Sequence, residues 1–595
     1  MSELKTREEI APQYKWRLED LFPSEEAWEQ ELKRLEEIVP EAARFKGKLN
    51  NMESVLEMLR FTDEISLSME RLFVYARMSR DTDNACSKYV SWVDRVSSLM
   101  VRYDEITSYI RPELNDIDSA LLIEWSQNPR MKDYDYMLRE LVRSKPHVLS
   151  DEAERILALS GEIGDSYDTI YTMLSDVDLK FAPIKDEKGV EQPMSHGRYR
   201  LYLESRQRDI RRQAYESMFK AYMEQINTVT ALYGSNVKKD VFYTRARKFP
   251  SCRERALFGG DIPVSVYDGL LEAVSEKLPL LHKYVELRKK VLGLSDLKMY
   301  DMYVPMFEAF EGEYTFEDAC NLVLEALSPL GEKYISVLKK AFSEGWIDVY
   351  ETKGKSSGAY SWGAYGTHPY MLLNFQGRLD DAFTLAHEAG HSMHSYFSDE
   401  AQSYPKAQYL IFVAEVASTV NEVLMLKHLV SRTDNDNMKK YLLEFFLEQF
   451  RTTVFRQTMF AEFELVAHEH AEKGESLTRE WLCETYGGLN KKYYGEAVET
   501  DELISAEWAR IPHFYRAFYV YQYATGFCAA VAIASRILKE GEPAVADYLK
   551  FLSSGGSGAP IELLKLAGVD LSDKAVLRRS LEEFGNTLEE LKRML

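Results

Sequence analysis

A histidine-rich segment, DAFTLAHEAGHSMHSYF at residues 381–397, holds the side chains best suited to chemistry. Its HEAGH core places His387 and His391 four residues apart, so on a helix both imidazoles leave the same face. This spacing lets two ring nitrogens reach one zinc ion at about 2.0–2.1 Å. Glu388 stands at the edge of that face, where it can reach a metal-bound water rather than the metal. The pattern predicts a zinc site that carries its own general base.

The alternative is a chance match on an ordinary helix. Histidine is scarce, with 11 residues in a chain of 595. A chance HExxH match in such a chain is expected on the order of 1–2% of the time. The motif also follows a predicted strand and lies in mid-helix, and Gly390 would leave room near the metal. We therefore expect one zinc ion per chain.

A catalytic zinc site needs a third protein ligand and an open fourth position. The pattern HExxHxxGxxH would place a third histidine at position 397, which is phenylalanine. His394 lies near the same face, but one straight helix is poorly placed to supply three ligands to a tetrahedral centre. We expect His394 to be structural or to support a ligand residue, with direct binding of the metal as the less favoured alternative.

The following segment, QYLIFVAEVASTVNEVLML, offers two acidic candidates for the third ligand. Glu415 and Glu422 are seven residues apart on one face of an otherwise apolar helix, and a buried carboxylate is costly unless it is paired or binds a metal. The small residues Ala414, Ala417 and Ser418 would let this helix pack close to the histidine helix. We favour Glu415 as the ligand and Glu422 as the group that orients an imidazole N–H. The residues alone leave the opposite assignment open.

A second histidine pair, in AHEHAEKGE, does not form a comparable motif. His468 and His470 are two residues apart and would point in different directions on a helix. No second histidine follows at the four-residue spacing. We expect both to be structural.

The elements that must position these residues are mostly helical. SEEAWEQELKRLEEIV is typical of the first ~175 residues: a serine cap and an acidic first turn precede apolar residues at helical spacing. DEKG, within 176–195, indicates a hairpin or loop. GWIDVY and YMLLNFQG read as strands around a loop rich in glycine, serine and aromatic residues, whose length is typical of a functional or mobile segment. We expect a mostly α protein with one small sheet directly before the histidine helix.

The composition of the chain disfavours several functional classes. There are 74 basic and 96 acidic residues, a net charge of −22, which disfavours binding to nucleic acid or to an anionic membrane surface. Five separated cysteines indicate reduced thiols, and the N-terminus shows no secretory signal, so we expect a cytoplasmic protein. The uncharged segment 517–535 is interpreted as a buried helix rather than a membrane span. Self-association into a homo-oligomer is left open.

The chain closely resembles the oligoendopeptidase F branch of the thimet-oligopeptidase family of zinc metallopeptidases. The resemblance rests on HEAGHSMH, FVAEVAST and IPHFYRAFYVYQYATG, and also on YKWRLEDLFPSEEAWEQEL and FLSSGGSGAPIELLKLAGVDL near the two ends. It implies His387, His391 and Glu415 as zinc ligands and Glu388 as general base. It also implies an almost all-helical ellipsoid around a deep substrate channel. We expect an N-terminal helical lobe at 1–200 and a catalytic domain at 201–595.

In the thimet branch, a histidine and several tyrosines on a late helix bind the substrate carbonyl. His513 and four tyrosines occupy the corresponding region here, although their spacing differs, so which tyrosine contacts the carbonyl stays open. A tyrosine stripe on a helix is more often core packing. We nevertheless expect His513 and Tyr519 to be catalytic and to line the cleft across from the zinc, with Tyr515 a weaker candidate on the same helix face. We expect Tyr515 and Tyr521 to contact substrate.

These expectations together predict a zinc-dependent endopeptidase that cuts short unstructured oligopeptides, with Glu388 assisting a zinc-bound water. The strand YMLLNF would bind an extended peptide by strand addition, with Tyr370 and Asn374 contacting it, and the loop before it would close over the peptide. Two other classes remain. A zinc aminopeptidase needs an acidic group for the substrate amine, and no such motif is evident. A peptide-binding protein with a structural zinc leaves Glu388 unexplained.

Overall fold

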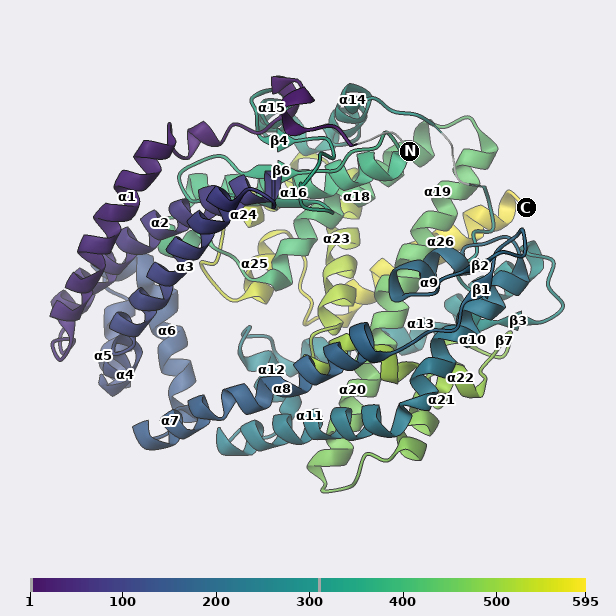
Figure 1. Cartoon of the computed structure of the whole chain (residues 1–595), viewed down its shortest axis with the longest axis horizontal. Helices are drawn as coiled ribbons and strands as arrows, with labels where there is room; N and C mark the ends of the chain where they lie inside the picture. The colour runs from purple at the N-terminus through teal and green to yellow at the C-terminus, as the bar shows by residue number, and fades with distance from the viewer. Residues whose placement is uncertain (1–3, 309–311) are drawn as a thin grey trace. The chain divides into compact units, whose positions relative to one another are not determined.

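The protein is built mostly from α-helices, as Figure 1 shows for the computed structural model, which describes residues 4–308 and 312–595. The mostly α fold class is therefore confirmed. The chain divides into two compact units, each formed by three separate segments. None of the segment boundaries falls at residue 200. The division into a lobe at 1–200 and a catalytic domain at 201–595 stays a prediction. The ellipsoidal outline and the deep channel also stay predictions.

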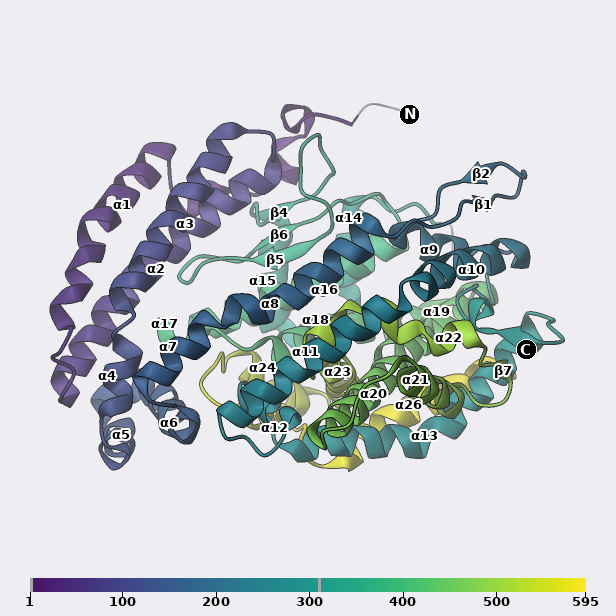
Figure 2. The same ribbon diagram turned by 60° about the horizontal axis from the view of Figure 1, so that its bottom comes forward.

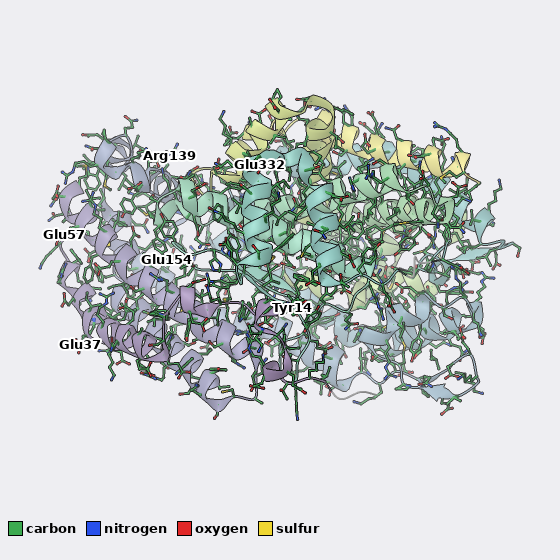
Figure 3. All side chains as sticks on the ribbon, turned by 90° about the horizontal axis from the view of Figure 1, so that it is seen from above. Tyr14, Glu37, Glu57, Arg139, Glu154 and Glu332 are labelled. Atoms are coloured by element: carbon green, nitrogen blue, oxygen red, sulfur yellow. The ribbon has the colours of Figure 1, made fainter. Side chains whose placement is uncertain are left out.

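The first unit comprises Met1–Pro146, Glu311–His428 and Ile533–Val569. Its N-terminal helices bury large aromatic side chains: Trp28 packs on Trp92 with ring centroids 5.0 Å apart, and the Trp28 indole N–H donates to the Leu72 carbonyl at 3.0 Å. Exposed charged residues, among them Glu37, Glu57 and Arg139, extend outward from these helices in Figure 3. The helices of this part of the chain are α1 (Glu25–Ile38), α2 (Met52–Thr82), α3 (Ser87–Thr107), α4 (Ile110–Asp116), α5 (Ser119–Ser126), α6 (Asp135–Ser144), α14 (Phe316–Ala326), α15 (Gly331–Ser343), α16 (Leu379–Ala401), α17 (Tyr404–Ala407), α18 (Ile411–Arg432), α24 (Glu542–Leu552) and α25 (Pro560–Leu566).

A three-stranded sheet lies next to α16 in the first unit (Figure 1). Its order is β4 (Ile347–Asp348), β6 (Tyr370–Leu372) and β5 (Tyr360–Trp362), with β4 parallel and β5 antiparallel to β6. The sheet thus precedes the histidine helix, as predicted. The segment between the two expected strands is not structureless, because it forms β5.

The position of β6 overturns one expectation. The YMLLNF strand pairs with β4 on one side and with β5 on the other. A peptide therefore cannot add to β6, because its backbone groups are already used on both edges. The pattern of a short apolar strand does not reveal whether the strand is central or at an edge.

The second unit comprises His147–Phe310, Leu429–Ala532 and Asp570–Leu595. Figure 2 shows the β1–β2 hairpin beside α9 and α10, where the sequence indicated a hairpin or loop. A second two-stranded pair joins β3 to β7, so the described chain has two small ribbons beyond the single sheet expected. The elements are α7 (Asp151–Leu159), α8 (Gly161–Thr172), α9 (His196–Leu203), α10 (Arg208–Glu224), α11 (Ile226–Ala246), α12 (Cys252–Phe258), α13 (Val264–Val291), α19 (Asp436–Gln449), α20 (Arg456–Glu472), α21 (Arg479–Tyr494), α22 (Glu502–Ser505), α26 (Lys574–Arg593), β1 (Ile184–Lys185), β2 (Glu191–Gln192), β3 (Leu297–Lys298) and β7 (Val498–Glu499).

The uncharged segment at 517–535 contributes most of α23 (Tyr521–Glu540), whose small and apolar side chains, such as Ala524, Cys528 and Ala530, are fully buried. The interpretation as a buried helix is confirmed. Within the described ranges, no helix is long and apolar enough to cross a membrane. All five cysteines are free thiols.

Candidate metal centre

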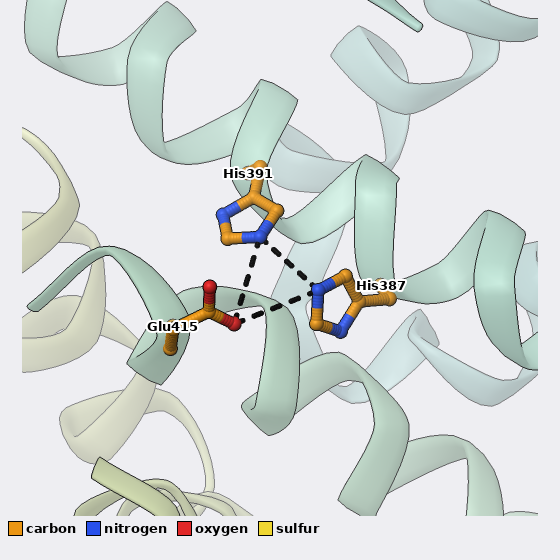
Figure 4. A group of neighbouring side chains, drawn as sticks. All are labelled: His387, His391 and Glu415. Atoms are coloured by element: carbon orange, nitrogen blue, oxygen red, sulfur yellow. Dashed lines mark hydrogen bonds and ion pairs between the residues drawn. The ribbon is translucent and has the colours of Figure 1, made fainter. Parts of the chain in front are cut away.

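Two helices bring three possible ligand atoms together (Figure 4). His387 and His391 come from α16 and Glu415 from α18. The two Nε2 atoms are 3.1 Å apart, and the Glu415 Oε2 atom lies 3.6 Å from His387 Nε2 and 3.8 Å from His391 Nε2. Ligand atoms about 2.0–2.1 Å from a tetrahedral zinc ion are separated by roughly 3.3 Å. The three atoms therefore have the spacing of a metal site.

The partners of the other ring nitrogens leave both Nε2 atoms available to bind a cation. His387 Nδ1 lies 2.5 Å from Glu422 Oε1, so Nδ1 carries the proton that this carboxylate accepts. The main-chain carbonyl of Ala414 lies near the His391 ring and opposes the lowering of the His391 pKa by burial. Both Nε2 lone pairs then converge with the Glu415 carboxylate, and three acceptors that face one another are stable only around a positive charge.

The close approach of α18 to α16 depends on Gly390. A Cβ atom at this position would lie 2.5 Å from Ser418 Cα and 2.7 Å from the Ala417 carbonyl oxygen, both backbone atoms. Asn421 fixes the same contact, because its side-chain amide donates to the Ala386 carbonyl at 3.0 Å. We expected Gly390 to leave room near the metal; instead it leaves room for the helix that carries Glu415.

The Glu415 carboxylate is not buried, contrary to the argument from its apolar neighbours. Its side chain is 48% exposed, whereas that of Glu422 is 18% exposed. Glu415 faces the pocket above the histidines, and Ser418 Oγ donates to its main-chain oxygen at 3.0 Å. Exposure toward a pocket suits a ligand that must leave the metal accessible to substrate.

Glu388 is 6% exposed and lines the same pocket. Burial raises the pKa of its carboxyl to about 7; His387 opposes the rise, and Glu415 and Glu422 add to it. Its Oε2 atom accepts no hydrogen bond from any described residue. A carboxylate with a free oxygen and a pKa near neutrality is suited to take up a proton during a reaction at pH 7.

The pocket has a volume of about 450 Å³ and lies entirely within the first unit. One face of α16, with His391, Ser395 and Asp399 spaced four residues apart, forms one wall. The edge strand β5 and the residues after it, as far as Tyr365, form another. The Ser361 hydroxyl on β5 hydrogen bonds to Ser392 on α16 at 2.7 Å, which ties the two walls together. None of the lining residues is lysine or arginine.

Asp399 at the far end of this pocket supports a testable prediction about stability. Burial raises the pKa of Asp399 to about 7. The folded state therefore keeps a proton between about pH 4 and 7 that the unfolded state has lost, and stability falls as pH rises through this window. Asp399→Asn removes that dependence. We expect the variant to be at most about 1 kcal/mol more stable than the parent near pH 4.5, and to gain a further ~1–3 kcal/mol over it by pH 8.

Denaturant unfolding at both pH values measures this difference. Glu400→Gln, at an exposed position on the same helix, is the matched control and should show no pH-dependent difference. A stability difference for Asp399→Asn that is the same at pH 4.5 and pH 8 would contradict the assignment.

Three other predicted site residues lie away from the ligand atoms. His394 is buried and stacks on Tyr409, with ring centroids 3.7 Å apart, and burial lowers its pKa to about 3. Tyr370 has no exposed surface, and its hydroxyl donates to the Arg17 carbonyl. The Asn374 side-chain amide donates to the carbonyls of residues 356 and 358. In this structure Tyr370 and Asn374 hold the sheet and its loop, so the interpretation of both as residues that contact substrate is not supported by their positions.

The tyrosine-rich segment belongs to the second unit, and it is not one helix. A 3₁₀ turn ends at Tyr515 and α23 begins at Tyr521, so Tyr515 and Tyr519 do not share a helix face as predicted. Tyr515 is buried against Tyr171, and Tyr521 is buried against Tyr267. These two side chains are packing residues here.

The other aromatic residues of this segment form a half-buried cluster. The His513 and Tyr519 rings are nearly parallel with centroids 6.2 Å apart, and the Tyr523 hydroxyl lies 3.3 Å from His513 Nε2. Tyr523 is one of the four tyrosines that the resemblance placed in this region, but it was not chosen as a site residue. Its ten-residue separation from His513 gave no signal, because the turn that brings the two together is not visible in the residue pattern.

The fold and this site define the chain as a helical metallopeptidase with an HExxH helix. The model of peptidase family M3 matches residues 201–583, and the oligopeptidase F model matches residues 113–181. Oligopeptidase PepF of Bacillus subtilis is 42% identical over 100% of this chain and 89% of its own length. The oligoendopeptidase F homolog of Lactococcus lactis is 39% identical over 99% of both chains. A crystal structure of oligoendopeptidase-F from Enterococcus faecium superposes with a TM-score of 0.73 at 35% identity, covering 95% of this chain and 98% of that one.

This chain belongs to peptidase family M3, in its oligoendopeptidase F branch. The resemblance found from the sequence motifs is thereby confirmed. The chain is a metallopeptidase of the oligopeptidase type.

Proposed function

We propose that the protein is a zinc-dependent endopeptidase that hydrolyses internal bonds of short, unstructured peptides. The observation that carries the proposal is the convergence of two imidazole nitrogens and one carboxylate oxygen, with Glu388 beside them in the same pocket. Two nitrogen ligands and one oxygen ligand form a set that catalytic zinc sites use, with the fourth position left for water or substrate.

His387, His391 and Glu415 would hold the zinc ion, which would supply Lewis acidity for the activation of water. Glu388 accepts a proton from the attacking water through its free oxygen and returns it to the leaving amine. Glu422 holds the proton on His387 Nδ1 and keeps the other ring nitrogen available as a ligand. His513 and Tyr519 are proposed to donate hydrogen bonds to the carbonyl oxygen as it gains negative charge.

The edge of β5 is the proposed binding strand for peptide, in place of β6. Among the described strands, β5 pairs only with β6, so no strand covers its other edge. Residues of β5 and of the turn after it line the pocket that contains Glu388. An extended peptide that adds to this edge gains main-chain hydrogen bonds, which favour unstructured substrates over folded ones. The five free thiols support a reducing, cytoplasmic location.

A peptide blocked at both ends and carrying a fluorophore and a quencher tests the proposal. We expect cleavage at an internal bond, loss of cleavage after treatment with a chelator, and recovery when zinc is added back. An aminopeptidase would not cut a peptide without a free amine, and a binding protein with a structural metal would not cut it at all. Failure of the zinc-loaded protein to cut any of a library of blocked peptides would disprove the proposal.

A further inference from the structure

Phe518, directly before Tyr519, has a left-handed backbone conformation with φ of +56°. In the described part of the chain, Phe518, Lys248 and Asp261 are the non-glycine residues with positive φ. This conformation is uncommon for a bulky residue and persists only where its surroundings enforce it. It falls between the turn that ends at Tyr515 and the start of α23, where the chain changes direction.

A buried carboxyl from α20 holds this conformation. Glu464 has no exposed surface, and its Oε1 atom accepts the Phe518 main-chain N–H at 3.0 Å. Its Oε2 atom accepts no hydrogen bond from the described residues. A buried carboxyl is costly, so its presence at this turn calls for an explanation beyond packing.

Two aromatic side chains clamp the Phe518 ring. The His468 ring lies 4.7 Å from it, and the Tyr267 ring lies 5.8 Å from it. His468 is fixed in turn, because its Nδ1 atom donates to the Glu464 main-chain oxygen at 2.8 Å. His468, one of the two histidines that do not form a metal motif, thus supports this turn.

The turn determines where the following residue lies. Tyr519 is half-buried beside His513 and packs edge-on against Tyr523, with ring centroids 5.5 Å apart. If Phe518 relaxed to a negative φ, the chain after it would leave in another direction and Tyr519 would leave this cluster.

We infer that Glu464 is a positioning residue of the peptidase: its carboxyl holds Phe518 in the left-handed conformation and thereby keeps Tyr519 beside His513 and Tyr523. The inference rests on the proposed function, in which His513 and Tyr519 bind the substrate carbonyl. Glu464 acts on this cluster through its hydrogen bond to the Phe518 main chain.

The charge of Glu464 makes its conservative variant informative. Burial raises the pKa of its carboxyl well above the usual value of 4.5, and Asp240 adds to the rise, although the Phe518 N–H opposes it. These effects favour the neutral acid over the carboxylate. Glutamine has the same shape, is also neutral, and offers an oxygen to the Phe518 N–H.

The test compares Glu464→Ala with Glu464→Gln in the zinc-loaded protein. We expect Glu464→Ala to lower kcat on the order of 10–100-fold, with KM and zinc content unchanged, and Glu464→Gln to keep near-normal kcat. In a Tyr519→Phe background, Glu464→Ala should have little further effect on kcat, because the two changes remove the same interaction. Should Glu464→Ala not fold, Glu464→Leu fills the space without accepting a hydrogen bond and takes its place.

Tyr109→Phe is the matched control for general destabilisation. It removes a buried hydroxyl that donates to the Ala42 carbonyl at 2.6 Å and leaves the Glu464–Phe518 hydrogen bond intact. We expect a lower melting temperature and an unchanged kcat. Normal kcat in a folded Glu464→Ala protein, equal losses in Glu464→Gln, or additive losses with Tyr519→Phe would each overturn the inference.

An NMR measurement, which does not depend on catalysis, separates this inference from the proposed function. The NMR signals of ring-labelled tyrosine, with Tyr519 assigned by its loss in Tyr519→Phe, should shift in Glu464→Ala and stay in place in Glu464→Gln. If the parent protein cuts no peptide but the Tyr519 signal moves as expected, the proposed function fails and the positioning role stands. An unmoved signal in Glu464→Ala refutes the positioning role, whatever the activity.

Discussion

We expect Glu388→Gln to abolish peptide hydrolysis while the protein keeps its bound zinc. Glutamine has nearly the same shape as glutamate, and the three candidate ligand atoms of His387, His391 and Glu415 are untouched. What is lost is the carboxylate oxygen that accepts a proton from water. Removal of a general base typically costs about 10²–10⁴-fold in rate, so we expect kcat to fall by at least that much.

Two measurements on one preparation check this result: the rate of cleavage of the blocked quenched peptide, and the bound zinc by elemental mass spectrometry. Glu400→Gln, which neutralises an exposed carboxylate on the same helix, is the control and should keep full activity. A zinc-replete Glu388→Gln protein that retained more than about a tenth of the parent kcat would show that another group serves as the base.

The sequence predicted the helical part of this centre because helix geometry is local. Four-residue spacing alone places His387 and His391 on one face, and the structure has their Nε2 atoms 3.1 Å apart. Spacing could not choose between Glu415 and Glu422, because residues seven apart share a face and differ only in how they meet another helix. That choice depends on the contact between α16 and α18 at Gly390, which is a tertiary feature.

The strand order of the sheet and the break in the tyrosine segment were also hard to predict, because both depend on tertiary contacts. A three-residue strand such as β6 looks alike whether it is central or at an edge, and only the pairing with β4 and β5 decides. The aromatic run from His513 to Tyr523 reads as one continuous helix. It is interrupted because Glu464, about fifty residues earlier in the chain, holds Phe518 in a conformation that ordinary helix periodicity does not anticipate.

Glu415→Ala and Glu422→Ala separate a metal ligand from a residue that orients one. Glu415 Oε2 faces both imidazole Nε2 atoms, so its removal takes away one of three candidate ligands, and we expect zinc to be lost at moderate chelator concentration. Glu422 contacts the far nitrogen of His387, at 2.5 Å. Its removal frees the ring to rotate and to change tautomer, which typically weakens metal binding by about 10–100-fold.

Competition for zinc against chelators of graded affinity, followed by measurement of bound metal, ranks the two variants. We expect Glu415→Ala to bind zinc more weakly than Glu422→Ala. Glu415 lies where the ligand atoms converge, whereas Glu422 acts on the metal only through the orientation of the His387 ring. His387 orientation adds a second test, because Glu422→Gln still offers an oxygen to Nδ1–H and should bind zinc more tightly than Glu422→Ala. Stronger zinc retention in Glu415→Ala than in Glu422→Ala would mean that Glu422 is the ligand and that the helices rearrange around the metal.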